Sequence, residues 1–284
     1  MISIHFEEKS DCQQLFQQLS SYMKRYAKFG LKGHVQAEGS EMILVNYENE
    51  HVNFYDSFQP FLASVLTEYV IATKEEEWLL DIIETMFYFT DEEEQQQILT
   101  IARAILEGDR KDLPSLSPFF NRRAFVYEAF SKHIEEEMTF YYEPFITFRL
   151  REYGEMLIDC VEIAIDEYMM EQEYQNMVED FRQYIRLKKP KRDKLILVHD
   201  GTFTFYDEHA CKISKEEILF HLQEDLVFEQ GVAIEEMVIS PLVCMLPETV
   251  KVFSNNNEHG VILTIQTIFQ ERMELYPLEK FKLN

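Results

Sequence analysis

The feature that most constrains the fold is a 46-residue stretch, from Pro144 to Lys189, that contains no further proline and a single glycine, Gly154. Its apolar residues recur at steps of three and four, which is the period of an α-helix with one buried face. An unbroken helix of this length would span roughly 70 Å at about 1.5 Å per residue. Because this is long for one domain, the pattern predicts a long helix with a break past Glu171.

Upstream of this stretch, the sequence predicts a small α/β unit at 1–52. Ser10 is placed to begin a helix whose apolar residues follow a helical period. Residues 2–6 alternate apolar and polar side chains as a strand does. Two short strand candidates, 31–36 and 42–47, are separated by the turn signal at 38–40.

A helical region is predicted at 53–190. Pro60 suits the first turn of its first helix, because a proline there loses no hydrogen bond. The sequence Thr90-Asp91-Glu92-Glu93 is typical of a capped helix start. A break is expected at 113–118 and a further helix at 122–137.

After Pro190 the period changes to two, and we expect a C-terminal α/β domain at 195–284. Two alternating segments flank Asp200-Gly201, a strong signal for a β-hairpin with a type I′ turn. A strand, a helix and a final strand follow between Glu248 and Tyr276, as in a βαβ crossover. The predicted fold class is therefore α+β or mixed α/β, with a helical middle and one long helix. The first and last parts could form one sheet or two.

The chain carries 52 acidic and 27 basic residues, a formal net charge of −25 at pH 7. Such a surface repels DNA, RNA and anionic membranes, because phosphate binding needs lysine and arginine to displace counterions. With 46% hydrophobic residues the chain is nevertheless too rich in core formers to be disordered.

The four cysteines form no CxxC pair, which favours free thiols; they are Cys12, Cys160, Cys211 and Cys244. The first residues lack the basic and apolar regions of a signal peptide. The longest apolar run, 237–247, is about half a membrane span. We therefore expect a cytoplasmic protein without a transmembrane helix.

One segment departs from the acidic average: residues 182–194 carry seven bases against a single acid, Asp193. The bases are Arg182, Arg186, Lys188, Lys189, Lys191, Arg192 and Lys194. Cations near a helix C-terminus favour the helix dipole, which explains part of this run. The alternative is a contact for phosphate or for an acidic partner surface, and these seven residues are the candidates for partner binding.

A second candidate site lies at the predicted hairpin. His199, Asp200, Asp207 and His209 are the densest polar cluster of the sequence, and a ligand-binding or catalytic histidine is one interpretation. We expect His199 and Asp200 to lie opposite Thr202, with Asp207 and His209 farther along, so the cluster is less convergent in space than in sequence. The simpler interpretation is a structural hairpin with polar residues on its surface.

The long helix also carries a row of carboxylates at steps of four, three and four: Glu155, Asp159, Glu162 and Asp166. Such a row is compatible with a metal-binding or acid–base face. The chain has no HExxH, GxSxG, GxGxxG or GxxxxGK[ST] motif. A solvated face is therefore the simpler interpretation, and we predict no cofactor, no catalytic residue and no tightly held transition metal.

Several blocks of the sequence resemble the YtxC-like family. They are Glu75-Glu76-Glu77-Trp78-Leu79, Gly108-Asp109-Arg110-Lys111-Asp112, Phe148-Arg149-Leu150, 164–168 with 171–175, 199–208, and 265–272. The resemblance covers essentially the whole chain, and the hairpin block 199–208 is its most specific part. It implies a sporulation protein of endospore-forming Gram-positive bacteria, and it implies no particular reaction or cofactor.

Three functions fit these observations. The first is a non-catalytic cytoplasmic interaction or scaffold protein of sporulation, with aromatic-rich helices as its binding surface for a protein partner. The second is a nucleic-acid-associated accessory protein acting through 182–194, which the net charge disfavours. The third is a metal-dependent hydrolase at His199, Asp207 and His209 or at the helix carboxylates. The absence of every familiar catalytic spacing favours the first.

Overall fold

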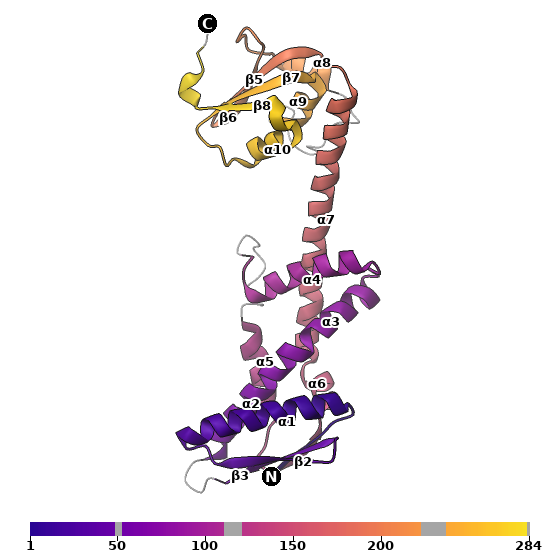
Figure 1. The fold of residues 1–284 in the computed structure, drawn as a ribbon, viewed down its shortest axis with the longest axis vertical. Coiled ribbons are helices and arrows are strands. Elements are labelled where there is room, and N and C mark those ends of the chain that lie inside the picture. The colour runs from indigo at the N-terminus through magenta and orange to yellow at the C-terminus, as the bar shows by residue number, and fades with distance from the viewer. Residues whose placement is uncertain (49–52, 111–120, 223–236, 283–284) are drawn as a thin grey trace. The chain divides into compact units, whose positions relative to one another are not determined.

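A computed structural model of the chain describes residues 1–48, 53–110, 121–222 and 237–282. The chain divides into two compact units, unit 1 at Met1–Met169 and unit 2 at Met170–Asn284 (Figure 1). Over the described residues each unit has its own hydrophobic core and one four-stranded sheet. The fold class is therefore α+β as predicted, and the first and last parts of the chain form two separate sheets.

Unit 1 is built on a sheet with the order β2-β3-β1-β4, in which β1 is antiparallel to β3 and parallel to β4. Its strands are β1 (Ile2–His5), β2 (Gly33–Glu38), β3 (Met42–Tyr47) and β4 (Met138–Tyr141). Its helices are α1 (Lys9–Tyr26), α2 (Phe54–Thr73), α3 (Glu75–Asp81), α4 (Glu92–Glu107), α5 (Arg122–Ser131), α6 (Tyr142–Arg149) and the first part of α7 (Arg151–Leu187).

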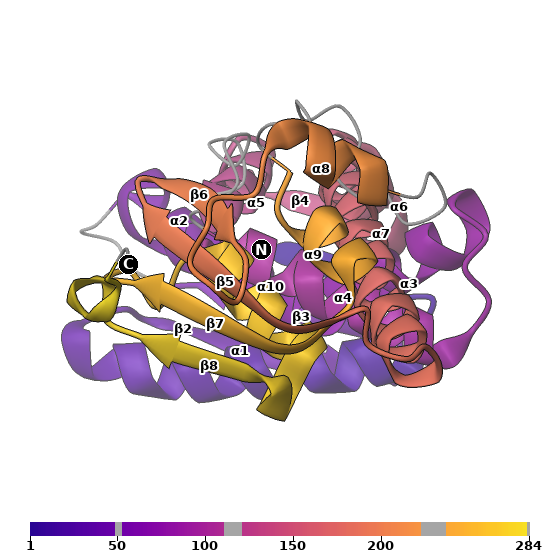
Figure 2. The ribbon, with the colours of Figure 1, turned by 90° about the horizontal axis from the view of Figure 1, so that it is seen from above.

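Unit 2 holds the rest of α7 and a second sheet with the order β6-β5-β7-β8, which Figure 2 shows side by side. Strands β5, β7 and β8 run parallel, and β6 is antiparallel to β5. The elements are β5 (Arg192–Asp200), β6 (Thr202–Tyr206), α8 (Lys215–His221), α9 (Ile239–Met245), β7 (Pro247–Ser254), α10 (Gly260–Phe269) and β8 (Met273–Tyr276). The predicted strand–helix–strand crossover is confirmed as β7–α10–β8.

The core of unit 1 joins one face of its sheet to the helices. Ile4 of β1 lies opposite Ile43 of β3, and both side chains are fully buried. Leu15 and Leu19 of α1 are buried in the same core. Because strand side chains alternate between the two faces, the apolar residues of β1 and β3 reach the helices together.

Of the local capping signals, the start at Ser10 is wrong, because α1 begins at Lys9 and Ser10 lies inside it. Those at α4 and α8 are confirmed. The Asp91 side chain accepts hydrogen bonds from the backbone N–H groups of Glu93 and Glu94, which begins α4. Gly108 ends that helix with a φ of 80°. Ser214 begins α8 in the same way as Asp91 begins α4. The predicted break at 113–118 lies outside the described residues.

The expected role of Pro60 is wrong, because α2 begins at Phe54 and Pro60 lies inside the helix. The side chain of Asn53 accepts the N–H of Tyr55 at 2.9 Å and so starts the helix earlier. Proline has no N–H, so Pro60 leaves the carbonyl of Asp56 without its helical hydrogen bond.

The helix expected at 122–137 ends at Ser131, and β4 follows it. Extending the helix through Glu135, Glu136 and Glu137 would place three negative charges at the negative end of the helix dipole. Strand β4 has only four residues, and its partner β1 lies more than a hundred residues earlier in the sequence. No local sequence pattern therefore predicts β4.

The long helical stretch is interrupted at Leu150, and the expected break past Glu171 is wrong. Leu150 is buried and separates α6 from α7, which then continues for 37 residues. Helix α7 supplies buried side chains to both cores, through Tyr168 in unit 1 and from Met177 in unit 2. Residues 169–176 supply none. No described helix is long and apolar enough to cross a membrane.

Candidate functional site

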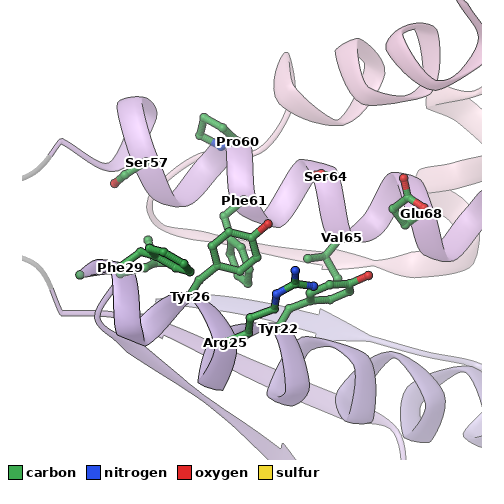
Figure 3. A pocket seen from close by; sticks show the side chains of 12 residues that line it. Tyr22, Arg25, Tyr26, Phe29, Ser57, Pro60, Phe61, Ser64, Val65 and Glu68 are labelled. Carbon is green, nitrogen blue, oxygen red and sulfur yellow. The ribbon is translucent and has the colours of Figure 1, made fainter.

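A groove of about 720 Å³ lies between α1 and α2 in unit 1 (Figure 3). One wall is the C-terminal half of α1 with the turn after it, and the other wall is α2. We call it the α1–α2 groove. It is lined by Tyr22, Arg25, Tyr26, Phe29, Gly30, Leu31, Ser57, Pro60, Phe61, Ser64, Val65 and Glu68.

Aromatic rings form one end of this groove. The ring of Tyr26 meets the edge of Phe61 at a centroid distance of 5.6 Å, and Phe29 lies 6.3 Å from Tyr26. Tyr26 is 42% exposed and Phe29 is 79% exposed. Large aromatic side chains left open to water beside a concave surface are typical of recognition sites.

The local sequence explains the shape of the groove. Tyr22 and Tyr26 are four residues apart on α1, so they share one face of the helix. Gly30 adopts a φ of 94° after the short 3-10 turn Ala27–Phe29, which lets the chain turn away below Phe29. On the opposite wall, Pro60 and Phe61 line the groove, and the Phe61 ring lies beside Tyr26 (Figure 3).

The other end of the groove is charged. Arg25 is exposed and forms no ion pair with another described residue, whereas Glu68 is paired with Arg123. The sequence around Arg25 is also unusual in its charge. No acidic residue occurs between Asp11 and Glu38, although acids make up 52 of the 284 residues.

Sequence reasoning missed this site, and the missing acids were the signal that could have found it. The acid-free segment (residues 12–37) contains four exposed bases, Lys24, Arg25, Lys28 and Lys32. Lys24 and Arg25 are in the last turn of α1, where the helix dipole favours cations. Lys28 and Lys32 lie beyond that helix, so the dipole does not explain them.

In unit 2, the basic run 182–194 is partly engaged within the fold. Arg182 donates to the carbonyl of Thr267 at 3.0 Å, and Lys191 donates to the carbonyl of Cys244 at 3.2 Å. Arg192 pairs with Glu217. The remaining bases are the exposed Arg186, Lys188 and Lys189 and the half-buried Lys194.

The hairpin at Asp200-Gly201 is confirmed, but its turn is not type I′. Such a turn needs positive φ at both central residues, and among the two only Gly201 has it, at 75°. The register pairs His199 with Phe203 and Asp200 with Thr202. His199 therefore stacks on the ring of Phe203, with centroids 4.4 Å apart.

The structure does not bring His199 together with Asp207 and His209. Asp207 follows the far end of β6, and its Oδ1 accepts the N–H groups of His209 and Cys211, which fixes a tight turn. The His209 side chain is exposed and faces Glu208 at 3.3 Å. Asp200 is exposed at the opposite end of the hairpin.

His199 instead meets residues that are distant in the sequence. Its Nδ1 lies 3.0 Å from Ser254 Oγ at the end of β7, and its ring lies 4.7 Å from that of His259, the residue that caps α10. Ser254 is only 2% exposed, and its Oγ accepts the N–H of Asn256. The Ser254 hydroxyl therefore has little access to solvent. Burial, together with the neighbouring His259, lowers the pKa of His199.

The predicted row of carboxylates on α7 is open to solvent. Glu155, Asp159, Glu162 and Asp166 are all exposed on α7. Among the described residues, no group of three or more histidines, cysteines or acids is arranged to hold a metal ion.

Among the described residues of unit 1, Asp11 and Glu75 are the buried acids, and each has partners. Asp11 lies 2.8 Å from the Lys74 ammonium and accepts the Tyr69 hydroxyl at 2.9 Å. Glu75 accepts Arg122 and the hydroxyl of Tyr153, and burial raises its pKa in spite of both.

Comparison with known proteins shows which family the chain is similar to. A family model described as the YtxC-like family matches residues 60–274, which include α2 from Pro60 onward and exclude α1. The uncharacterized protein YtxC of Bacillus subtilis (strain 168) is 37% identical over 223 residues, which are 78% of this chain and 79% of that protein. No solved structure matches the chain significantly. Because the family model covers most of its length, the chain belongs to the YtxC-like family.

Proposed function

We propose that this protein is a non-catalytic, cytoplasmic interaction protein of spore formation, and that it holds a protein partner in the α1–α2 groove. The resemblance to the YtxC-like family supplies the setting. The observation that carries the binding role is the pair of exposed rings, Tyr26 and Phe29, beside a groove of about 720 Å³. Partly exposed aromatic side chains dominate the binding energy of many interfaces.

The polar residues that could carry out catalysis are engaged within the fold, which favours a binding role over an enzymatic one. His199 is bonded to an enclosed serine, Asp207 is used by its own turn, and Glu75 is neutralised by Arg122. The hydrolase alternative loses support because its residues lie at opposite ends of the hairpin. The nucleic-acid alternative loses support because Arg182, Lys191 and Arg192 are engaged within unit 2.

The test compares Tyr26→Ala/Phe29→Ala with Tyr55→Ala in a strain that lacks the native gene. Tyr55 is a matched control because it is 50% exposed on α2 and does not line the groove. We expect the double variant to lower the yield of heat-resistant spores about tenfold or more, since each aromatic anchor contributes over about 1 kcal/mol. The Tyr55→Ala strain should match the wild type.

A cross-linking experiment addresses contact directly. A photoreactive residue at Ser64, inside the groove, should capture one defined protein in sporulating cells, and the same residue at Asp159, on the solvated face of α7, should not. Thermal melts first establish that each variant is folded. A folded double variant that forms spores normally, with equal cross-linking at both positions, would refute the proposal.

A further inference from the structure

We infer that the occupant of the α1–α2 groove is an acidic, extended peptide segment that places a carboxylate against Arg25 and an apolar side chain against Tyr26 and Phe29. This inference rests on the proposed function, because it names the chemistry of the partner at the same groove.

The carboxylate is inferred from the charge that the fold leaves uncompensated. Arg25 lines the groove and has no ion pair among the described residues. Its guanidinium offers five donors in a planar fork that matches a carboxylate. Glu68, the only acid among the described residues that line the groove, is paired with Arg123. The open charge of the groove is therefore positive.

The surrounding chain strengthens this local field. Lys24, Lys28 and Lys32 are exposed near Arg25 in sequence, and no acid occurs in the acid-free segment. The whole protein carries −25, which would repel an acidic partner at a distance. Salt screens exposed charges beyond about 8 Å at physiological ionic strength, so the nearest charges decide the contact. A local excess of four bases then favours an acidic segment.

The aromatic end of the groove indicates that the ligand also carries an apolar side chain. Tyr26, Phe29 and Phe61 form a cluster with free ring area, and Pro60 borders it. A groove of about 720 Å³ has the size of a small-ligand site, so it admits a few residues of a chain but no folded domain. Aromatic-lined grooves of this kind take extended segments whose apolar side chains pack against the rings.

Single-stranded nucleic acid is the competing occupant, because it also combines stacking with negative charge. Four bases in a chain of −25 are few for a phosphate backbone, which gains affinity by displacing counterions along its length. We therefore assign the groove to an acidic peptide and include an oligonucleotide in the test.

The experiment selects short random peptides displayed on phage against the full-length protein. Wild type should enrich an acidic residue next to an aromatic residue or proline. Arg25→Glu should abolish the acidic preference, and Tyr26→Ala should abolish enrichment altogether. Arg186→Glu is the control, because it changes the net charge equally at an exposed site in unit 2. For a selected peptide, replacing its acid by the amide should weaken binding about tenfold.

The outcomes separate the two proposals. Enrichment of aromatic peptides without an acid, unchanged by Arg25→Glu, would overturn the acidic ligand and leave the groove as a peptide site. No enrichment on wild type beyond that on Tyr26→Ala would overturn the peptide site itself. Displacement of the selected peptide by single-stranded oligothymidylate, but not by an acidic peptide of unrelated sequence, would assign the groove to nucleic acid.

Discussion

At the scale of single residues, Gly201 has a backbone conformation that other residues resist. Its φ is 75°, and a Cβ built there would meet no atom within 4 Å, so only the backbone penalises a side chain. Gly201→Val should lower the free energy of unfolding by about 1–3 kcal/mol. Gly154→Ala is the control: it also meets no atom, has no positive φ, and should stabilise α7 by about 0.5–1 kcal/mol. Urea unfolding measures both, and equal stability of Gly201→Val and wild type would contradict the argument.

His199 should make unit 2 sensitive to mild acid. Its pKa is lowered by burial first and by His259 second, while Asp200 opposes the shift. The unfolded chain then binds a proton more readily than the folded one, so the stabilisation is complete above the ordinary histidine pKa and is lost as the pH falls below it towards the folded value. His221, whose pKa is lowered by burial, Arg192 and Lys191, acts in the same direction.

Thermal unfolding of wild type and His199→Gln at pH 7.5 and pH 5.5 tests this prediction. The loss of stability between the two pH values should be smaller in His199→Gln, and His209→Gln, at an exposed position, should behave as the wild type does. The general effect of acid on a −25 chain is common to all three proteins and cancels. A pH dependence that is the same in all three would show that His199 titrates alike in both states.

At the scale of elements, Arg272 ties the end of α7 to the start of β7. Its guanidinium donates to the carbonyls of Glu248 at 2.8 Å, Pro247 at 2.6 Å and Ile185 at 3.3 Å. Arg272→Met leaves these acceptors without a charged donor and should destabilise unit 2 by about 1.5–3 kcal/mol. Arg186→Met, at an exposed site on α7, should change the stability little. Denaturant unfolding followed by circular dichroism measures the stability of both variants. Equal unfolding midpoints for Arg272→Met and the wild type would contradict this role of Arg272.

Elements with local signals could be predicted from the sequence, and elements defined by distant partners could not. Asp91, Ser214 and the strands around Gly201 act within a few residues, so the sequence indicates them correctly. Strand β4 exists because β1 offers it an edge, and the interruption at Leu150 has no proline or glycine within three residues on either side. Neither β4 nor the interruption at Leu150 is indicated by a pattern in the nearby sequence.

The candidate groove was unpredictable for the same reason. It forms where α1 meets α2, and its lining residues run from Tyr22 to Glu68. The periodicity of each helix indicates a buried face but does not say which residues of two helices border one groove. The separation of the hairpin histidines, by contrast, could be predicted from the sequence: His199 and His209 are close in sequence, and the extended strand between them separates them in space.

At the scale of the whole molecule, one helix supplies both cores through separate parts. Tyr168 is buried in unit 1 and Met177 in unit 2, while residues 169–176 supply no fully buried side chain and only the half-buried Tyr174 packs against the core of unit 2. A proline in a helix interior costs about 3 kcal/mol where the helix is held by packing. Glu173→Pro should therefore leave the unfolding of unit 1 nearly unchanged, whereas Val161→Pro should unfold unit 1.

Differential scanning calorimetry with near-ultraviolet circular dichroism would measure the unfolding of each unit in both variants. Val161 is the matched position, because it is fully buried on the same helix. If Glu173→Pro melted unit 1 as strongly as Val161→Pro, residues 169–176 would have to contribute to the core of unit 1.

The pairing of β1 with β4 also sets the order in which the chain can fold during synthesis. Strands β1, β2 and β3 are complete at Tyr47, but β4 begins only at Met138. At about 5–20 residues per second, a ribosome needs roughly 5–18 s to make the chain between them. Throughout that interval one edge of β1 has no strand beside it, and an open strand edge is a template for pairing with another chain. The nascent protein should therefore depend most on chaperones before residue 141 has emerged.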